Sequence, residues 1–190
     1  MLNGTLIPGF VVVIKEEVER LLKAGFIYPI PLIEWVSNIV PVNKKHGTIR
    51  VCIDFRDLNW ACPKYNFPTA YIDQIIDNCA RSVIFSFMDG FFGYNQIEIL
   101  LLDQHKTTFI FPLGSFTYHK IPFSLKNIGV TFQRAMSYAF HDIKNVVEPY
   151  LDDLPAHSKQ RDIHVDHLRA MFLWCHHFNI CLNPHNVFFL

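Results

Sequence analysis

The run of residues 82–88, SVIFSFM, is almost continuously hydrophobic and ends in Asp89. A run of this length and composition is typical of a strand that is buried on both faces. A chain that contains such a strand must build a core around it. With 190 residues, 51% of them hydrophobic, this chain has the material for one compact domain.

Shorter periodic segments surround this strand. Amphipathic spacing predicts helices, and alternating or short apolar runs bounded by Gly, Pro or Asn predict further strands. Helices are predicted at 15–24, 71–79, 129–141 and 161–178, and strands at 38–43, 48–55, 96–102, 107–111, 115–121, 146–151, 154–158 and 186–190. Because helices and strands do not alternate strictly, the pattern favours an α+β fold.

The bulk composition restricts the class of partner. Seventeen basic residues balance seventeen acidic ones, so any contact with a polyanion must come from local patches. The five cysteines show no paired spacing, which is typical of reduced thiols inside a cell. No apolar run approaches the roughly 20 residues of a membrane helix, and no signal peptide is recognisable, so we expect an intracellular protein with no membrane partner. The abrupt ends are typical of a piece of a longer polyprotein.

Three carboxylates are predicted to lie at strand ends. Asp89 follows the buried strand, and Asp152 and Asp153 occupy a short turn between two strands. If the strands pair, the carboxylates converge at one end of the sheet, where they suit a hard cation such as Mg²⁺. Neighbouring strand residues point to opposite faces, so we expect Asp152 to be the principal ligand together with Asp89. A pair of Asp residues in a turn is, by itself, more often simple turn chemistry.

Five blocks then occur in a fixed order: WVSNIVPVNKKHGTIRVCIDF with RDLNWACPKYNFP, FSFMDGFFGYNQI, IPFSLKNIGVTFQRAM and YLDDL. In this order and spacing, residues 11–190 resemble the reverse transcriptase of gypsy-type LTR retrotransposons, a plant-like element in particular. The resemblance implies one domain over 1–190 with the α+β fingers and palm of a right-hand polymerase, an antiparallel palm sheet, and no thumb or RNase H. Fingers are expected mainly in 11–82 and 103–121, and palm mainly in 83–102 and 122–190.

The resemblance also implies roles for individual residues. It makes Asp89, Asp152 and Asp153 the catalytic ligands of two Mg²⁺ or Mn²⁺ ions, and Tyr94 the ring that excludes a 2′-hydroxyl. The other implied residues bind the deoxynucleotide or the template: Lys44, Lys45, Arg50, Phe123 and Tyr150 for the nucleotide, and Gln133 and Arg134 for nucleic acid. The implied partners are a primed RNA or DNA template, dNTPs, and the RNase H, integrase and protease of a polyprotein, in the cytoplasm, in virus-like particles or in the nucleus.

Several positions depart from the family pattern. Ser124 replaces a glycine, Ile128 replaces a small residue, and Pro149 and Pro155 flank the Asp pair. Proline removes a ladder donor, so an inactive, degenerate copy that retains the fold is the alternative hypothesis. An RNA-dependent RNA polymerase is a further alternative, disfavoured by Tyr94. The His and Cys residues between 164 and 181 lack the spacing of a zinc module.

Overall fold

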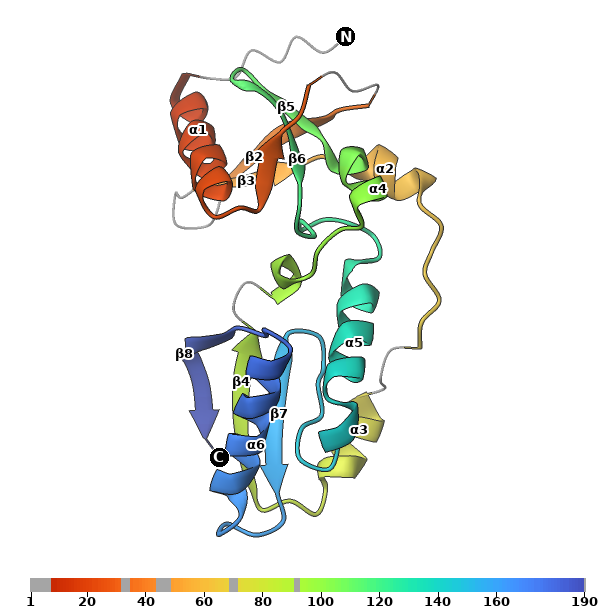
Figure 1. The fold of residues 1–190 in the computed structure, drawn as a ribbon, viewed down its shortest axis with the longest axis vertical. Coiled ribbons are helices and arrows are strands. Elements are labelled where there is room, and N and C mark those ends of the chain that lie inside the picture. The colour runs from red at the N-terminus through yellow and green to blue at the C-terminus, as the bar shows by residue number, and fades with distance from the viewer. Residues whose placement is uncertain (1–7, 32–34, 44–48, 69–71, 91–92, 190) are drawn as a thin grey trace. The chain divides into compact units, whose positions relative to one another are not determined.

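A computed structural model describes residues 8–31, 35–43, 49–68, 72–90 and 93–189. The chain forms two compact units (Figure 1). The first unit comprises residues 1–63 and 97–126, and the second comprises 64–96 and 127–190. The predicted Lys44 and Lys45 lie outside the described residues.

The first unit is built on a five-stranded sheet with the order β1-β6-β5-β2-β3. Neighbouring strands are antiparallel except for β2 and β5, which are parallel. Its elements are α1 (Pro8–Lys23), β1 (Ile27–Pro29), β2 (Ser37–Asn43), β3 (Ile49–Ile53), α2 (Arg56–Ala61), α4 (Leu101–Gln104), η2 (His105–Thr107), β5 (Phe109–Phe111) and β6 (Gly114–Tyr118). Helix α1 contributes Ile14 and Val18 to the core.

Aromatic rings dominate the core of the first unit. Phe109 is 1% exposed, and its ring centroid lies 5.9 Å from that of Phe116 and 5.5 Å from that of Tyr118. Phe55 meets Tyr118 edge to face at 6.4 Å. Large rings bury much apolar area per residue and gain from tilted contacts, so this sheet is held mainly by apolar packing.

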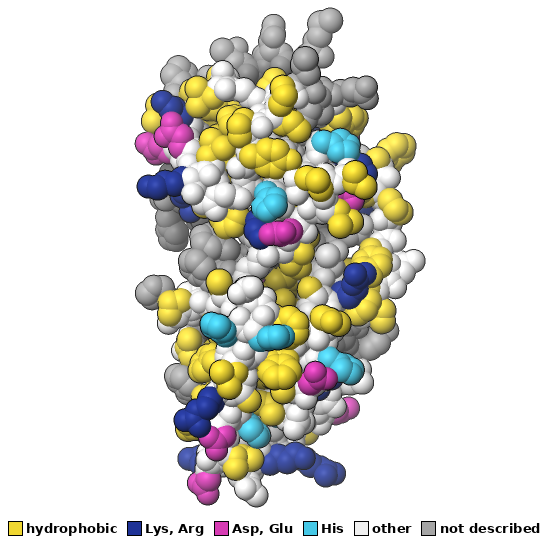
Figure 2. All heavy atoms as spheres, viewed as in Figure 1, with side chains coloured by type: hydrophobic (Ala, Val, Ile, Leu, Met, Phe, Trp, Pro, Cys, Tyr) yellow, Lys and Arg dark blue, Asp and Glu magenta, His cyan; other side chains and the backbone are white. Residues whose placement is uncertain are grey.

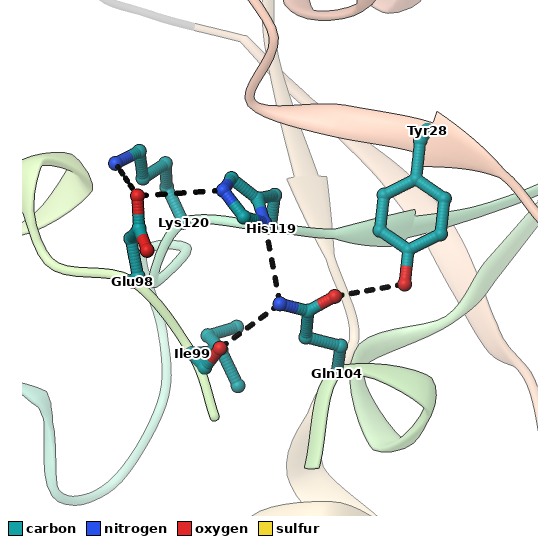
Figure 3. A network of polar contacts seen from close by, with 6 residues as sticks. All are labelled: Tyr28, Glu98, Ile99, Gln104, His119 and Lys120. Atoms are coloured by element: carbon teal, nitrogen blue, oxygen red, sulfur yellow. Dashed lines mark hydrogen bonds and ion pairs between the residues drawn. The ribbon is translucent and has the colours of Figure 1, made fainter. Parts of the chain in front are cut away.

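One polar network crosses the first unit (Figure 3). The Gln104 side-chain amide donates to the Ile99 carbonyl oxygen (2.9 Å) and lies 3.2 Å from His119 Nδ1, while Tyr28 Oη donates to Gln104 Oε1 (2.8 Å). Glu98 continues this network at the surface, since its Oε1 lies 3.4 Å from His119 Nε2 and accepts from Lys120 Nζ (2.7 Å). The buried amide of Gln104 is therefore satisfied on both its oxygen and its nitrogen.

The second unit contains an antiparallel sheet with the order β7-β4-β8, so the long apolar strand is central. Helix α6 packs on this sheet (Figure 1). The elements are α3 (Ile72–Cys79), β4 (Ile84–Gly90), η1 (Gly93–Gln96), α5 (Ile128–Ala139), η3 (His141–Ile143), β7 (Asp153–Ser158), α6 (His164–His177) and β8 (Leu182–Phe189). Gln96 fixes the start of β8, since its Nε2 donates to the Cys181 carbonyl oxygen (2.9 Å) and its Oε1 accepts from Cys181 N–H (2.7 Å).

Polar side chains lie inside the second unit, between the sheet and α6. Ser86 Oγ is 2.7 Å from His164 Nε2, and Ser158 Oγ is 2.7 Å from both His164 Nδ1 and His167 Nδ1. Burial lowers the pKa of His164 below its usual range, and the neighbouring His167 lowers it further. The histidine is therefore held neutral between two hydroxyl groups.

The structure corrects two predicted strands. Residues 96–102 form no regular strand: η1 ends at Gln96, an isolated bridge joins Glu98 to Lys120, and α4 begins at Leu101. Leu100, Leu101 and Leu102 are 75–84% exposed, so these hydrophobic residues lie at the surface and not in a buried strand. Residues 146–151 form only isolated bridges to β7. The first helix also begins at Pro8, earlier than the predicted residue 15.

On the face of the molecule that Figure 2 shows, hydrophobic side chains are interspersed with polar and charged ones in both units. Helix α6 contributes Val165, Phe172 and Leu173, which are 48–64% exposed.

Among the residues that the structure describes, no helix is both long enough and apolar enough to cross a membrane.

Candidate active site

The two adjacent aspartates lie on a two-residue turn. Tyr150 N–H donates to the Asp153 carbonyl oxygen (2.9 Å), and Asp153 N–H donates to the Tyr150 carbonyl oxygen (3.0 Å). The central residues are Leu151, whose φ is +53°, and Asp152, whose φ is not positive. Positive φ at the first central residue alone is the pattern of a type II′ turn, which normally takes glycine there. Leu151 therefore holds backbone strain at the point where the carboxylates are presented.

Strand pairing brings the third carboxylate to this turn. The register of β4 and β7 sets Asp89 opposite Asp153, and directly opposed residues project from the same face. Gly90 N–H donates to the Asp152 carbonyl oxygen (2.8 Å). A Cβ at Gly90 would lie 3.4 Å from that oxygen, and one at Gly93 would lie 3.5 Å from Asp152 Cβ; both are ordinary van der Waals distances, so the two glycines lie against Asp152 without being required there by space.

The electrostatics confirm that the carboxylates are neighbours. Protein atoms around the Asp153 carboxyl exclude water and raise its pKa, and the negative charges of Asp152 and Asp89 raise it further. Burial also raises the pKa of Tyr94, with a contribution from Asp152. Neighbouring negative charges disfavour ionisation of the Asp153 carboxyl, and a bound cation would relieve that repulsion.

The residue types fit a hard divalent cation. In the described part of the chain, no group of three or more His, Cys, Asp or Glu side chains is arranged to hold a metal ion, so the three aspartates do not form a three-ligand site in this structure. Mg²⁺ is commonly bound through one or two carboxylates, with waters and substrate phosphates completing its shell. Asp89, Asp152 and Asp153 match that partial ligand set.

Two further contacts border the carboxylates. The Tyr94 ring, on η1, meets Phe132 of α5 edge to face with centroids 5.1 Å apart. Asn183 Nδ2 is 3.5 Å from Asp89 Oδ2, a contact at the outer limit of a hydrogen bond. Sequence reasoning did not find Asn183, because it is 94 residues from Asp89 and only the pairing of β4 with β8 brings them together.

The two predicted template residues, although adjacent in the sequence, have different surroundings. Arg134 is exposed, and its guanidinium donates to Tyr65 Oη (2.5 Å) and lies 5.7 Å from the Tyr65 ring centroid. Gln133 is 2% exposed, and both ends of its amide are bonded to backbone beside the catalytic turn. A side chain buried and bonded in this way supports the turn, and its contact with the template stays a prediction.

The remaining predicted residues are divided between the units. Arg50, on β3, and Phe123 belong to the first unit and are exposed. Tyr150, in the second unit, is half-buried and forms the first corner of the turn.

The prolines beside the Asp pair disturb the sheet less than their positions in the sequence suggest. Strand β7 lies at the sheet edge, and the donors that face residues 146–150 alternate with those that face β4. His157 N–H donates to the Val146 carbonyl oxygen and Glu148 N–H donates to that of Pro155, so Pro155 faces away from β4. It removes one hydrogen bond to Glu148 and none to β4. Pro149 likewise faces away from β7, because Glu148 and Tyr150 make the cross-strand bonds.

Ser124 has an unusual backbone conformation. Its φ is +79°, in the left-handed region where glycine carries no Cβ penalty. Its carbonyl oxygen accepts from Asn59 Nδ2 (2.7 Å), and Lys126 N–H donates to Asn59 Oδ1 (2.7 Å), so the first unit holds this loop firmly. The serine is therefore strained in place.

Comparison with solved structures defines the class of fold. The chain superposes on the foamy viral protease-reverse transcriptase in complex with RNA/DNA hybrid with a TM-score of 0.83, at 19% identity, over 95% of this chain and 24% of that one. The native prototype foamy virus protease-reverse transcriptase gives a TM-score of 0.76 at 21% identity, over 87% and 22%. The predicted α+β fold of a right-hand polymerase, with fingers and palm, is thereby confirmed.

Comparison of sequences gives the family. The pattern of the family described as reverse transcriptase (RNA-dependent DNA polymerase) matches residues 42–190, and the chain belongs to this family. Transposon Tf2-3 polyprotein of Schizosaccharomyces pombe is 29% identical over 182 residues, and Tf2-7 polyprotein is 28% identical. The match covers 95% of this chain and 14% of each polyprotein, so the chain spans about one seventh of these relatives.

Proposed function

We propose that the chain is the RNA-directed DNA polymerase module of a gypsy-type LTR retrotransposon polyprotein, of a plant-like element. The observation that carries this proposal is the convergence of Asp89, Asp152 and Asp153 on two paired strands, with Tyr94 beside them. The first unit would act as the fingers and the second as the palm.

The carboxylates would hold two Mg²⁺ or Mn²⁺ ions, which when bound activate a primer 3′-hydroxyl and stabilise the leaving oxygen of pyrophosphate. The chain's own contribution is placement. Strand β4 fixes Asp89, and the type II′ turn fixes Asp152 and Asp153. Tyr94 is braced by Phe132 and would close the space needed by a 2′-hydroxyl.

The first unit would bind the triphosphate. Arg50, with Lys44 and Lys45, supplies cationic donors that suit phosphate oxygens. Phe123 and Tyr150 would complete the nucleotide site. Arg134, stacked near Tyr65, would contact the template backbone. The partners would be a primed RNA or DNA template, dNTPs and the other domains of a polyprotein, inside the cell.

Primer extension tests this proposal. The 190-residue chain is given an RNA template, a DNA primer, dNTPs and Mg²⁺, and is compared with Asp152→Asn and with Asp142→Asn, an exposed aspartate on η3. Incorporation that Asp152→Asn abolishes and Asp142→Asn preserves supports the polymerase. Absence of incorporation by a folded chain contradicts the proposal and supports the alternative of an inactive, degenerate copy. The strained backbone of Ser124 is the observation that favours this alternative.

Sugar selection tests the role of Tyr94 separately. Tyr94→Val should raise the use of rNTPs relative to dNTPs, because the smaller side chain leaves room for a 2′-hydroxyl. A native chain that preferred rNTPs would instead indicate an RNA polymerase.

A further inference from the structure

Gln133 ties helix α5 to the backbone of the catalytic turn. Its Nε2 donates to the Pro149 carbonyl oxygen (2.9 Å), and its Oε1 accepts from Leu151 N–H (2.7 Å). The two backbone groups flank Tyr150 on the side of the strand that faces away from β7. With 2% exposure, Gln133 forms both bonds out of contact with bulk solvent, where an unmet donor or acceptor costs most.

The turn needs this support at the same place. Leu151 has a φ of +53°, which its side chain disfavours, and Pro149 can offer only a carbonyl oxygen. Glutamine presents an acceptor and a donor on one planar group, so a single side chain satisfies a carbonyl and an N–H two residues apart. Phe132, the neighbour of Gln133 on α5, contacts Tyr94, so the same helical turn braces both borders of the carboxylate cluster.

We propose that Gln133 is a positioning residue that holds the Leu151 peptide and thereby fixes the carboxylates of Asp152 and Asp153. This inference rests on the proposed function for its catalytic consequence. Its structural part, the support of the turn and of its cation affinity, is measurable without any polymerase activity. A site that must keep carboxylates in place requires supporting side chains with locked conformations.

The first test removes both hydrogen bonds and keeps the length of the side chain. In Gln133→Met, hydrogen exchange of the Leu151 amide, followed by NMR, should be about tenfold faster or more, because two buried hydrogen bonds are lost. The apparent Kd for Mn²⁺ alone, measured by electron paramagnetic resonance, should rise severalfold. In primer extension, kcat should fall about tenfold while KM for dNTP changes less than threefold, because Gln133 is buried and bonds to the backbone beside the turn.

A second variant keeps the test valid if the methionine variant does not fold. Gln133→Glu retains an acceptor for Leu151 N–H, and its carboxyl donates to the Pro149 carbonyl oxygen only when protonated. Protection of the Leu151 amide in this variant should therefore be close to that of the native chain at low pH and lower at high pH, after correction for intrinsic exchange. Gln160→Met is the matched control, since Gln160 is an exposed glutamine of the same unit, and it should leave all three readouts unchanged.

The outcomes separate this proposal from the proposed function. Faster Leu151 exchange and weaker Mn²⁺ binding in a chain that never extends a primer would support the positioning role and contradict the polymerase. Leu151 exchange or Mn²⁺ affinity that stays at the native value in Gln133→Met would overturn the positioning role, whatever the activity. If that variant does not fold, pH-independent protection in Gln133→Glu would overturn it.

Discussion

The interiors of the two units differ in kind. The first unit is filled by aromatic rings around Phe109, and its main buried polar network centres on Gln104. The second unit buries Ser86, Ser158, His164 and Gln133 close to the strands that carry the aspartates. Buried polar groups fix geometry only when every partner is satisfied. Both units therefore bury polar side chains, among them Gln104, Thr107 and Thr117 in the first unit, and the difference is that those of the second unit lie close to the strands that carry the aspartates.

The two buried glutamines show this contrast directly. Gln104 joins the Tyr28 hydroxyl, the Ile99 carbonyl oxygen and the His119 ring, and so connects strand β1 to two segments outside the sheet (Figure 3). Gln133 bonds only to backbone, on two residues of one turn. The first glutamine stabilises a fold, whereas the second is placed to define the shape of a site.

The largest effect is expected from the aromatic core of the first unit. Phe109→Ala should lower the free energy of unfolding by about 3–5 kcal/mol, because it removes a ring packed against Phe116 and Tyr118. Urea denaturation followed by circular dichroism measures this loss. Ile110→Ala, on the same strand but 48% exposed, is the control and should cost far less. Equal losses for the two variants would show that this core is not closely packed.

A smaller loss is expected from the polar interior of the second unit. Ser86→Ala should lower the free energy of unfolding by about 1–3 kcal/mol, because His164 Nε2 loses its buried partner. The comparison is Ser37→Ala, a buried serine of the first unit outside the Gln104 network, for which we expect a smaller change in urea denaturation. A larger loss at Ser37 would remove the contrast between the two interiors.

Sequence patterns predicted the central strand, the strand that follows the Asp turn and the fold class, because hydrophobic residues recur along the sequence wherever one face of an element is buried. The prediction of a strand at residues 96–102 was wrong, because the leucines of α4 are exposed although their sequence has the composition of a buried strand. Sequence patterns also missed the hydrogen bonds of Gln133, because a glutamine on a helix carries no sign of whether it faces solvent or a backbone 16 residues away. Contacts such as that of Asn183 with Asp89 depend on strand register, which no local pattern encodes.

Acid pH should destabilise the second unit through its buried histidines. Burial lowers the pKa of both His157 and His164, and neighbouring His167 lowers each further, so the folded state favours their neutral forms. The stability they support is complete above the unfolded value of about 6.5 and is lost as pH falls from there towards their lower folded pKa values. Urea midpoints between pH 7.5 and 5 measure this slope.

The slope should flatten when both histidines are removed. His157→Gln with His164→Gln is the test, because glutamine keeps hydrogen-bonding capacity without titrating in this range. An unchanged slope in the double variant would assign the acid sensitivity to other groups.

The smallest effects are expected at the two strained turns, one in each unit. Ser124→Gly should raise the free energy of unfolding by up to about 1 kcal/mol, since relief of a φ of +79° outweighs the added entropy of the unfolded glycine. Leu151→Gly relieves a φ of +53° but removes a side chain whose Cδ2 lies 3.7 Å from where a Cβ of Gly129 would stand, so its gain should be smaller.

Ser137→Gly, within helix α5, should instead cost about 0.5 kcal/mol and serves as the control for glycine itself. If Ser124→Gly destabilised as Ser137→Gly does, the strain assigned to the first unit's loop would be absent. A gain in stability together with faster primer extension would show that the serine impairs the polymerase activity.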